Sequence, residues 1–346
     1  EFLFSAVEKD RRIVVGGSHG KTTITSMLLH AFKAIKSPVN FMVGAQLEGF
    51  DRMVHLDPRV QTAVFEGDEY LSSPIDRRPK FFWYQAHFTL LTGIAWDHIN
   101  VFPTEEDYIK QFDTYLETLA PNASVVWCEE DPHLAAVIRR TKRSDLTFIP
   151  YNTPVSALET DGTSMVSWAD GKTSRTPLIG THNMQNLAGA RALAATVGIS
   201  ASDFDSAMIN FTGAARRLEL LLETQNFIAF RDFAHAPSKL KATLQAVREN
   251  FSDYHLIACF ELHTYSSLNE AFLKEYNQSM EGADEAIVFY SKEALHIKGL
   301  EDLDSNAIKA HFNTHGLHVF NNKEDLWNYV HSSVNSQTGK PICLLL

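Results

Sequence analysis

The sequence predicts an α/β fold in two domains, each with a mostly parallel sheet, and three observations support this. Short apolar segments of strand length alternate along the chain with longer segments of helical period. A glycine-rich turn joins the first such strand to the first helix. Acidic or polar residues recur directly after apolar segments, at the strand ends where α/β sheets bind ligands. A length of 346 residues also fits two domains.

The composition narrows the class of protein. A chain that is 45% hydrophobic and 21% charged can bury full cores. The 31 basic and 42 acidic residues give a formal net charge of −11, so we expect no nucleic-acid partner. No apolar segment approaches the roughly 20 residues of a membrane span. The cysteines, Cys128, Cys259 and Cys343, lie far apart and fit free thiols in a reducing cytoplasm.

The first domain is predicted to cover residues 1–212. Its expected strands and helices follow one another at 12–35, 41–44, 63–65, 90–94, 104–119, 124–127 and from 132. In the helix 104–119, Thr104 and Asp107 resemble a capping box. Residues 145–180 alternate in short segments between turns, which predicts a small β-rich insertion, and a helix resumes at Thr181.

The second domain is predicted to cover residues 213–346 and to be Rossmann-like. Strands are expected at 227–230, 255–260 and 286–289, with helices at 238–249 and 268–280. The chain starts without Met and stops inside an apparent strand, 341–346, so we expect a fragment of a longer protein.

The turn after the first strand predicts a phosphate site. Glycines let backbone N–H groups point inward, and the following helix start adds a positive partial charge. The full pattern G-x-x-x-x-G-K-[ST] fails at Val15, but a shortened loop from Gly17 fits. Lys21 would reach the outer phosphates and Thr22 would offer its hydroxyl to magnesium, as in a P-loop ATPase-type domain. The candidate nucleotide-binding residues here are Gly17, Ser18, His19, Gly20, Lys21, Thr22 and Thr23.

Further candidates follow later strands. Glu66 opens a cluster of three carboxylates and is a candidate magnesium ligand, because magnesium prefers oxygen. His98 is a candidate ligand or a residue that orients one, although a lone histidine is more often structural. Asn183 and Asn186 share a helix face and could read adenine, unless Asn183 only caps the helix.

Two candidates lie near the domain boundary. Arg216 and Arg217 could hold an anionic group, since arginine binds phosphate with two hydrogen bonds, or they could simply be solvated. Asp232 ends another strand and could equally cap a turn.

Taken together, these residues resemble the Mur ligase family, the ATP-dependent amide-forming enzymes of peptidoglycan synthesis. The family's loop T-G-T-[NH]-G-K-T is matched from Gly16 onward, with Gly16 in place of the first threonine. Its invariant residues fall on Lys21, Glu66, His98, Asn183, Asn186, Arg217 and Asp232. The segments 66–70 and 76–81 look like the peptidoglycan-recycling branch, the murein peptide ligases.

The sequence departs from that family in three places. The N-terminal domain that binds the UDP part of the substrate is missing. The lysine that some branches carbamoylate is replaced by Phe112, with Lys110 out of register. The recycling branch's E-P-R-S segment reads Glu-Leu-His-Thr at 261–264, which leaves open the group that meets the peptide's carboxylates.

The resemblance implies a bacterial cytoplasmic enzyme that uses ATP and Mg²⁺. Lys21, Glu66 and His98 would be catalytic, and Thr22, Glu66 and His98 would hold the metal. The asparagines would hold adenine, while Arg217 and Asp232 would contact phosphate and ribose. The implied substrates are UDP-N-acetylmuramate and the tripeptide L-Ala-γ-D-Glu-meso-diaminopimelate, with the oligomeric state left open.

Other functions remain open. An enzyme of the same fold could add L-alanine to UDP-N-acetylmuramate or extend folate with glutamate. A fragment could also bind ATP without catalysing a reaction. A GTP-binding switch is a weaker alternative, because Asn322-Lys323-Glu324-Asp325 matches N-K-x-D but lies far from the loop.

Overall fold

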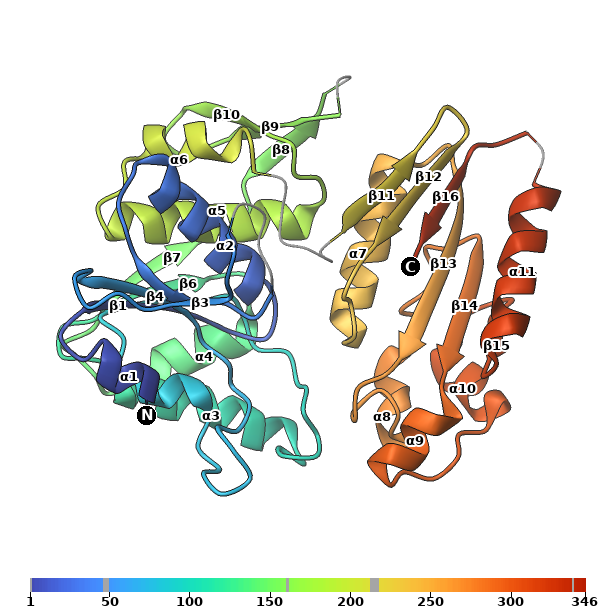
Figure 1. The fold of residues 1–346 in the computed structure, drawn as a ribbon, viewed down its shortest axis with the longest axis horizontal. Helices are drawn as coiled ribbons and strands as arrows, with labels where there is room; N and C mark the ends of the chain where they lie inside the picture. Colours follow the sequence, from blue (N-terminus) through green and yellow to red (C-terminus); the bar gives the residue numbers. More distant parts are fainter. Residues whose placement is uncertain (1, 46–49, 160–161, 212–217, 338) are drawn as a thin grey trace. The chain divides into compact units, whose positions relative to one another are not determined.

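The computed structural model describes residues 2–45, 50–159, 162–211, 218–337 and 339–346. They form two compact units, one of residues 1–97 and 101–215 and the other of residues 216–346 with the loop segment 98–100. Each unit has its own sheet with helices against it (Figure 1), which confirms the mixed α/β fold with largely parallel sheets. The expected boundary at residue 213 lies outside the described residues.

The first unit has a seven-stranded sheet in the order β3-β2-β4-β1-β5-β6-β7. All neighbours pair in parallel except β3 with β2. The central strand β1 reads Arg-Arg-Ile-Val-Val-Gly and is buried from its second residue on, because helices cover both faces of such a sheet. The strands are β1 (Arg11–Gly16), β2 (Asn40–Met42), β3 (Val54–His55), β4 (Thr62–Glu66), β5 (Phe88–Leu91), β6 (Ser124–Cys128) and β7 (Thr147–Tyr151).

The predicted β-rich insertion is smaller than expected. Its first strand, β7, belongs to the main sheet, where Phe148 pairs with Val125 of β6. Helix α4 (Pro132–Arg140) connects β6 to β7, and such a crossover brings the next strand back parallel. A separate antiparallel sheet contains β8 (Val155–Leu158), β9 (Ser164–Ser167) and β10 (Thr173–Thr176).

Two helices of the first unit matter most for the site. Helix α2 (Lys21–Ala34) begins directly after the glycine-rich turn, and α5 (Thr181–Thr196) packs against it. Helix α3 (Glu105–Thr118) begins as predicted, since the Thr104 hydroxyl accepts from the Asp107 N–H at 3.1 Å. The others are α1 (Phe2–Ala6), η1 (Lys80–Tyr84) and α6 (Ala201–Met208).

The second unit has a six-stranded sheet in the order β11-β12-β16-β13-β14-β15, antiparallel only between β11 and β12. The chain's last strand, β16, lies between β12 and β13, so the end of the chain completes the middle of this sheet. The strands are β11 (Glu219–Glu223), β12 (Phe227–Arg231), β13 (His255–Leu262), β14 (Glu285–Tyr290), β15 (His318–Phe320) and β16 (Ile342–Leu345).

The helix predicted over 268–280 is wrong in extent. The structure has α8 (Glu270–Leu273) and a 3₁₀ turn, η2 (Lys274–Tyr276). Asn269 caps the start, and Gln278 has a left-handed backbone with φ 56°, which a helix cannot continue through. The other helices are α7 (Pro237–Asn250), α9 (Lys292–Lys298), α10 (Ser305–Phe312) and α11 (Lys323–Ser336).

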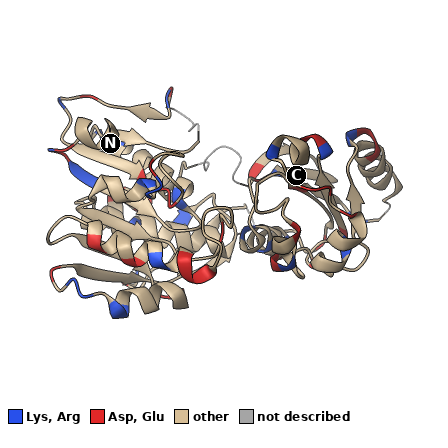
Figure 2. Cartoon of the chain, turned by 90° about the horizontal axis from the view of Figure 1, so that it is seen from below, with Lys and Arg blue, Asp and Glu red and all other residues tan. Residues whose placement is uncertain are grey.

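Within the described residues, no helix combines the length and the apolar character needed to cross a bilayer. Acidic and basic residues are interspersed over both units in Figure 2.

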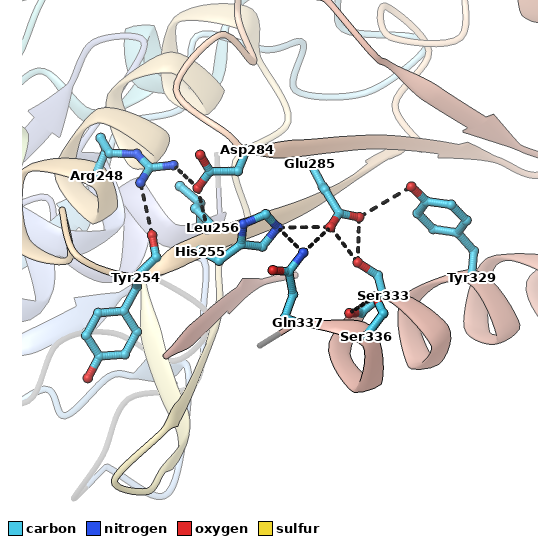
Figure 3. Close-up of polar contacts among 10 residues, drawn as sticks. All are labelled: Arg248, Tyr254, His255, Leu256, Asp284, Glu285, Tyr329, Ser333, Ser336 and Gln337. Carbon is cyan, nitrogen blue, oxygen red and sulfur yellow. Dashed lines mark hydrogen bonds and ion pairs between the residues drawn. The ribbon is translucent and has the colours of Figure 1, made fainter. Parts of the chain in front are cut away.

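A carboxylate at the start of β14 connects helix α11 to the six-stranded sheet of the second unit through hydrogen bonds (Figure 3). Glu285 accepts from the Ser333 hydroxyl at 2.6 Å and from Tyr329 at 3.3 Å, both on α11. His255, at the start of β13, lies 2.9 Å from the same carboxylate through Nε2. Burial raises the pKa of Glu285, but the hydrogen bonds from Ser333 and His255 outweigh burial and hold this pKa below its usual value.

We expect this network to make the second unit sensitive to acid. Because the folded-state pKa of Glu285 is depressed, its stabilisation is present above the ordinary carboxyl pKa of about 4.3 and is lost as the pH falls through the lower folded value. Glu285→Gln should cost about 1–3 kcal/mol at pH 7 and flatten the fall in stability below pH 5. Urea unfolding at several pH values measures this, with the exposed Glu293→Gln as control. Equal pH profiles for both variants would contradict it.

Candidate functional site

The glycine-rich turn is shaped by close backbone approach. Gly17 has φ 114°, and a Cβ there would come within 2.2 Å of the Thr92 hydroxyl. The Ser18 N–H donates to the carbonyl of Gly93 at 3.0 Å, which fixes the turn to the loop after β5. Gly20 stands at the N-cap of α2 and has no side chain to cap it. The first N–H groups of α2 therefore suit an anionic ligand.

The structure brings together two predicted magnesium ligands. The Thr22 hydroxyl donates to one oxygen of Glu66 at 2.9 Å, and the Gly44 N–H donates to the other at 2.7 Å. A Cβ on Gly44 would come within 2.8 Å of the Glu66 carboxylate, so the glycine makes this approach possible. A hydroxyl and a carboxylate are hard oxygen donors, and this donor set fits Mg²⁺.

Lys21 makes a contact that the sequence pattern did not reveal. Its ammonium lies 2.5 Å from Glu69, whose side chain is 2% exposed. Burial lowers the pKa of Lys21, but the carboxylates of Glu69 and Asp68 outweigh burial, so this pKa is raised and the lysine stays charged. Asp68 in turn pairs with Lys80 at 2.6 Å. The pKa of Asp68 would rise on burial, but the nearby Lys21 and Lys80 lower it.

Tyr108 is a second residue that sequence reasoning missed. Its side chain is fully buried on α3, and its hydroxyl donates to Glu69 at 2.9 Å and lies 2.8 Å from the Ser18 hydroxyl. The only sequence signal was its place on the first turn of a capped helix.

Asn183 and Asn186, the two candidate adenine-binding residues, differ in their surroundings. Asn186 is buried against the loop, at the position where a Cβ on Gly20 would come within 2.1 Å of its amide oxygen. Asn183 donates from its amide to the carbonyl of Ile179 at 2.9 Å, in the first turn of α5. The N-cap of α5 is Gly180, so the alternative that Asn183 caps this helix is wrong.

Three further predicted site residues are His98, Asp232 and Arg217. His98 has φ 59°, and a ring nitrogen of His98 and carboxylate oxygens of Asp68 and Glu69 all lie within 4.8 Å of one another. Asp232, in the second unit, accepts from the Phe233 N–H at 2.7 Å and from the Thr243 hydroxyl. Arg217, with Arg216, lies outside the described residues. The roles of His98, Asp232 and Arg217 in binding remain predictions from the sequence.

The family's carbamoylated lysine has no substitute on α3. Phe112 is fully buried and packs edge-on against Tyr108 and Phe81, so this position belongs to the apolar core. Lys110 is exposed.

His263, in the segment 261–264 that departs from the recycling branch, directly follows β13. Its ring lies against those of Phe233 and His235, with ring centroids 5.4 and 6.1 Å away.

The N-K-x-D segment that suggested GTP has a structural explanation. The Asn322 side chain accepts from the N–H groups of Glu324 and Asp325 at 2.8 and 3.3 Å, so it caps α11.

Comparison with known protein families identifies a domain in each half of the chain. Residues 15–194 match the Mur ligase middle domain, and residues 216–340 match the Mur ligase glutamate ligase domain. The chain belongs to the Mur ligase family. The matches cover the phosphate loop, the Thr22–Glu66 pair and most of the second unit.

Known relatives span several members of the family. UDP-N-acetylmuramate–L-alanine ligase from Mycobacterium marinum is 28% identical over 295 residues, which covers 80% of this chain and 59% of the relative. A solved murein peptide ligase from Psychrobacter arcticus has a TM-score of 0.66 and 21% identity, with coverage of 99% and 75%. Folylpolyglutamate synthase from Mycobacterium tuberculosis, solved with ADP and AMPPCP, has a TM-score of 0.74 and 15% identity, with coverage of 99% and 89%. These structural likenesses show the fold.

The chain thus spans about three fifths of the length of the Mycobacterium relative that it matches.

Proposed function

We propose that this chain supplies the ATP-binding and ligase domains of an ATP-dependent enzyme that forms an amide bond. The observation that carries the proposal is the shortened phosphate loop, with Lys21 at the helix start and Thr22 hydrogen-bonded to Glu66. Mg²⁺, when bound, would neutralise charge on the phosphates, and Thr22 and Glu66 would hold it, with His98 as a further predicted ligand.

The proposed reaction begins when a carboxylate oxygen of the acceptor sugar attacks the γ-phosphorus of ATP and ADP leaves. The amine of the second substrate then attacks the acyl phosphate carbonyl, and the tetrahedral intermediate loses a proton and phosphate. Catalysis of phosphoryl transfer depends mainly on positioning the reacting groups and neutralising their charge. Lys21 and the N–H groups at the start of α2 supply both at the phosphates.

The other candidates keep proposed roles in nucleotide binding. Asn183 and Asn186 would approach adenine, although Asn186 already supports the loop at Gly20. Arg217 and Asp232 would contact phosphate and ribose.

For the second substrate we propose the tripeptide L-Ala-γ-D-Glu-meso-diaminopimelate, with UDP-N-acetylmuramate as acceptor. The support for this choice is the resemblance of segments 66–70 and 76–81 to the recycling branch, and these two segments also contact each other. Asp68 pairs with Lys80, the Lys80 N–H donates to the carbonyl of Tyr70 at 3.0 Å, and Leu71 bridges Pro79. L-alanine is the second candidate, since it appears in the name of the Mycobacterium relative.

Phosphate release with ATP, UDP-N-acetylmuramate and either amine would test the proposal, using the protein with any segment that precedes Glu1 in its parent chain. Release with the tripeptide but not with L-alanine supports the recycling activity. Release with L-alanine alone would overturn the choice of substrate. ATP binding without release in either mixture would favour a non-catalytic ATP-binding module.

A further inference from the structure

Four polar side chains of the first unit form a connected chain that begins and ends in the phosphate loop. The Ala95 N–H donates to the Ser18 hydroxyl at 2.8 Å, and Ser18 lies 2.8 Å from the Tyr108 hydroxyl. Tyr108 donates to one oxygen of Glu69 at 2.9 Å, and Lys21 donates to the other at 2.5 Å. Ser18 and Lys21 are therefore connected through the same carboxylate.

The direction of every hydrogen bond in this chain is determined. The carboxylate of Glu69 only accepts, so Tyr108 gives its single hydroxyl proton to Glu69. Ser18 must then donate to Tyr108, while its oxygen accepts from the backbone N–H of Ala95. Burial and the charge on Glu69 raise the pKa of Tyr108 well above its usual value, which keeps this proton in place. Bonds aligned in this way strengthen one another.

Burial makes the chain costly to break. Tyr108 is fully buried, and Glu69 and Ser18, taken as whole residues, are 1% and 5% exposed. A buried carboxylate that lost its cation would keep an uncompensated charge, which is strongly unfavourable. The ammonium of Lys21 has three donors, so it can bind a phosphate oxygen without releasing Glu69.

We propose that Ser18, Tyr108 and Glu69 are positioning residues that fix both ends of the phosphate loop, and that Lys21 keeps its bond to Glu69 while it binds a nucleoside triphosphate. This inference rests on the proposed function, because it assumes that the loop binds ATP. The alternative, in which Glu69 competes with the phosphates for Lys21, predicts the opposite effect of weakening the chain.

Calorimetry with ATP and with inorganic triphosphate tests the proposal on the chain as it stands. Tyr108→Phe and Ser18→Ala should each weaken both ligands on the order of tenfold, the loss expected for about one hydrogen bond. The double variant should be little worse than either single variant, because both break the same chain. Binding of adenosine, which carries no phosphate, should stay unchanged, whereas a general loss of structure would weaken it too.

Tyr115→Phe is the matched control. Tyr115 is also fully buried on α3, but its hydroxyl bonds Thr89 at 2.9 Å. Tyr115→Phe should leave ATP affinity unchanged. If Tyr108→Phe fails to fold, Ser18→Ala tests the same prediction. Unchanged or tighter ATP binding in both test variants would overturn the proposal. If the unmodified chain bound neither ATP nor triphosphate, the proposed function itself would be wrong.

Discussion

Lys21→Ala is expected to slow ATP-dependent phosphate release by about 10²–10³-fold, the usual loss when one positioned charge-stabilising group is removed. The ammonium stands at the start of α2, where phosphate charge would gather, and Glu69 holds it. Steady-state phosphate release under the conditions of the substrate test measures the effect. Near-normal release by the variant would contradict the proposed ligase mechanism.

The same substitution should also lower stability, because it leaves the Glu69 carboxylate buried without its cation. Breaking one partner of a buried ion pair costs about 3–5 kcal/mol. The double variant Lys21→Ala/Glu69→Gln should regain stability and remain inactive, which separates the two effects. Lys33→Ala removes the same charge at the exposed end of the same helix. It should leave phosphate release unchanged and lower stability by no more than about 1 kcal/mol, from its contact with the Phe50 ring.

The sequence predicted the elements of this fold well where a pattern is local. The loop, the Thr104 cap of α3 and most strand positions depend on neighbouring residues, and all are found. The assignment of β7 failed because the partner of a strand is chosen by tertiary packing. The helix predicted over 268–280 failed because its pattern of apolar residues does not show the left-handed backbone of Gln278.

In the candidate site too, residues in local motifs could be predicted, whereas those placed by tertiary packing could not. Lys21, Thr22 and Glu66 could be found because each follows a strand or opens a helix in a recognisable motif. Tyr108 could not, since a tyrosine on a helix reads as part of an apolar core. Its contact with Ser18 spans 90 positions and exists only because α3 packs beside the loop.

Gly20→Ala is expected to weaken ATP binding about 10²-fold, because misplacing a positioned group by about 1 Å has effects of that size. Gly20 has φ 72°, and a Cβ would come within 2.1 Å of the Asn186 amide oxygen. Asn186 is buried on α5, so either this helix or the loop must shift. Overpacking of this kind also costs about 1–3 kcal/mol of stability. Calorimetric titration with ATP measures the first effect, and urea unfolding measures the second.

Gly198→Ala separates the clash from backbone strain. Gly198 also has a positive φ, 98°, but a Cβ there meets open space. It should cost only the strain of a left-handed residue, about 1 kcal/mol, and leave ATP affinity unchanged. If both variants bound ATP equally well, contact between Asn186 and Gly20 would not shape the loop. Pairing Gly20→Ala with Asn186→Ala removes the amide from the clash. The pair should recover part of the lost affinity for inorganic triphosphate, which has no adenine for Asn186 to contact, although strain at Gly20 would remain.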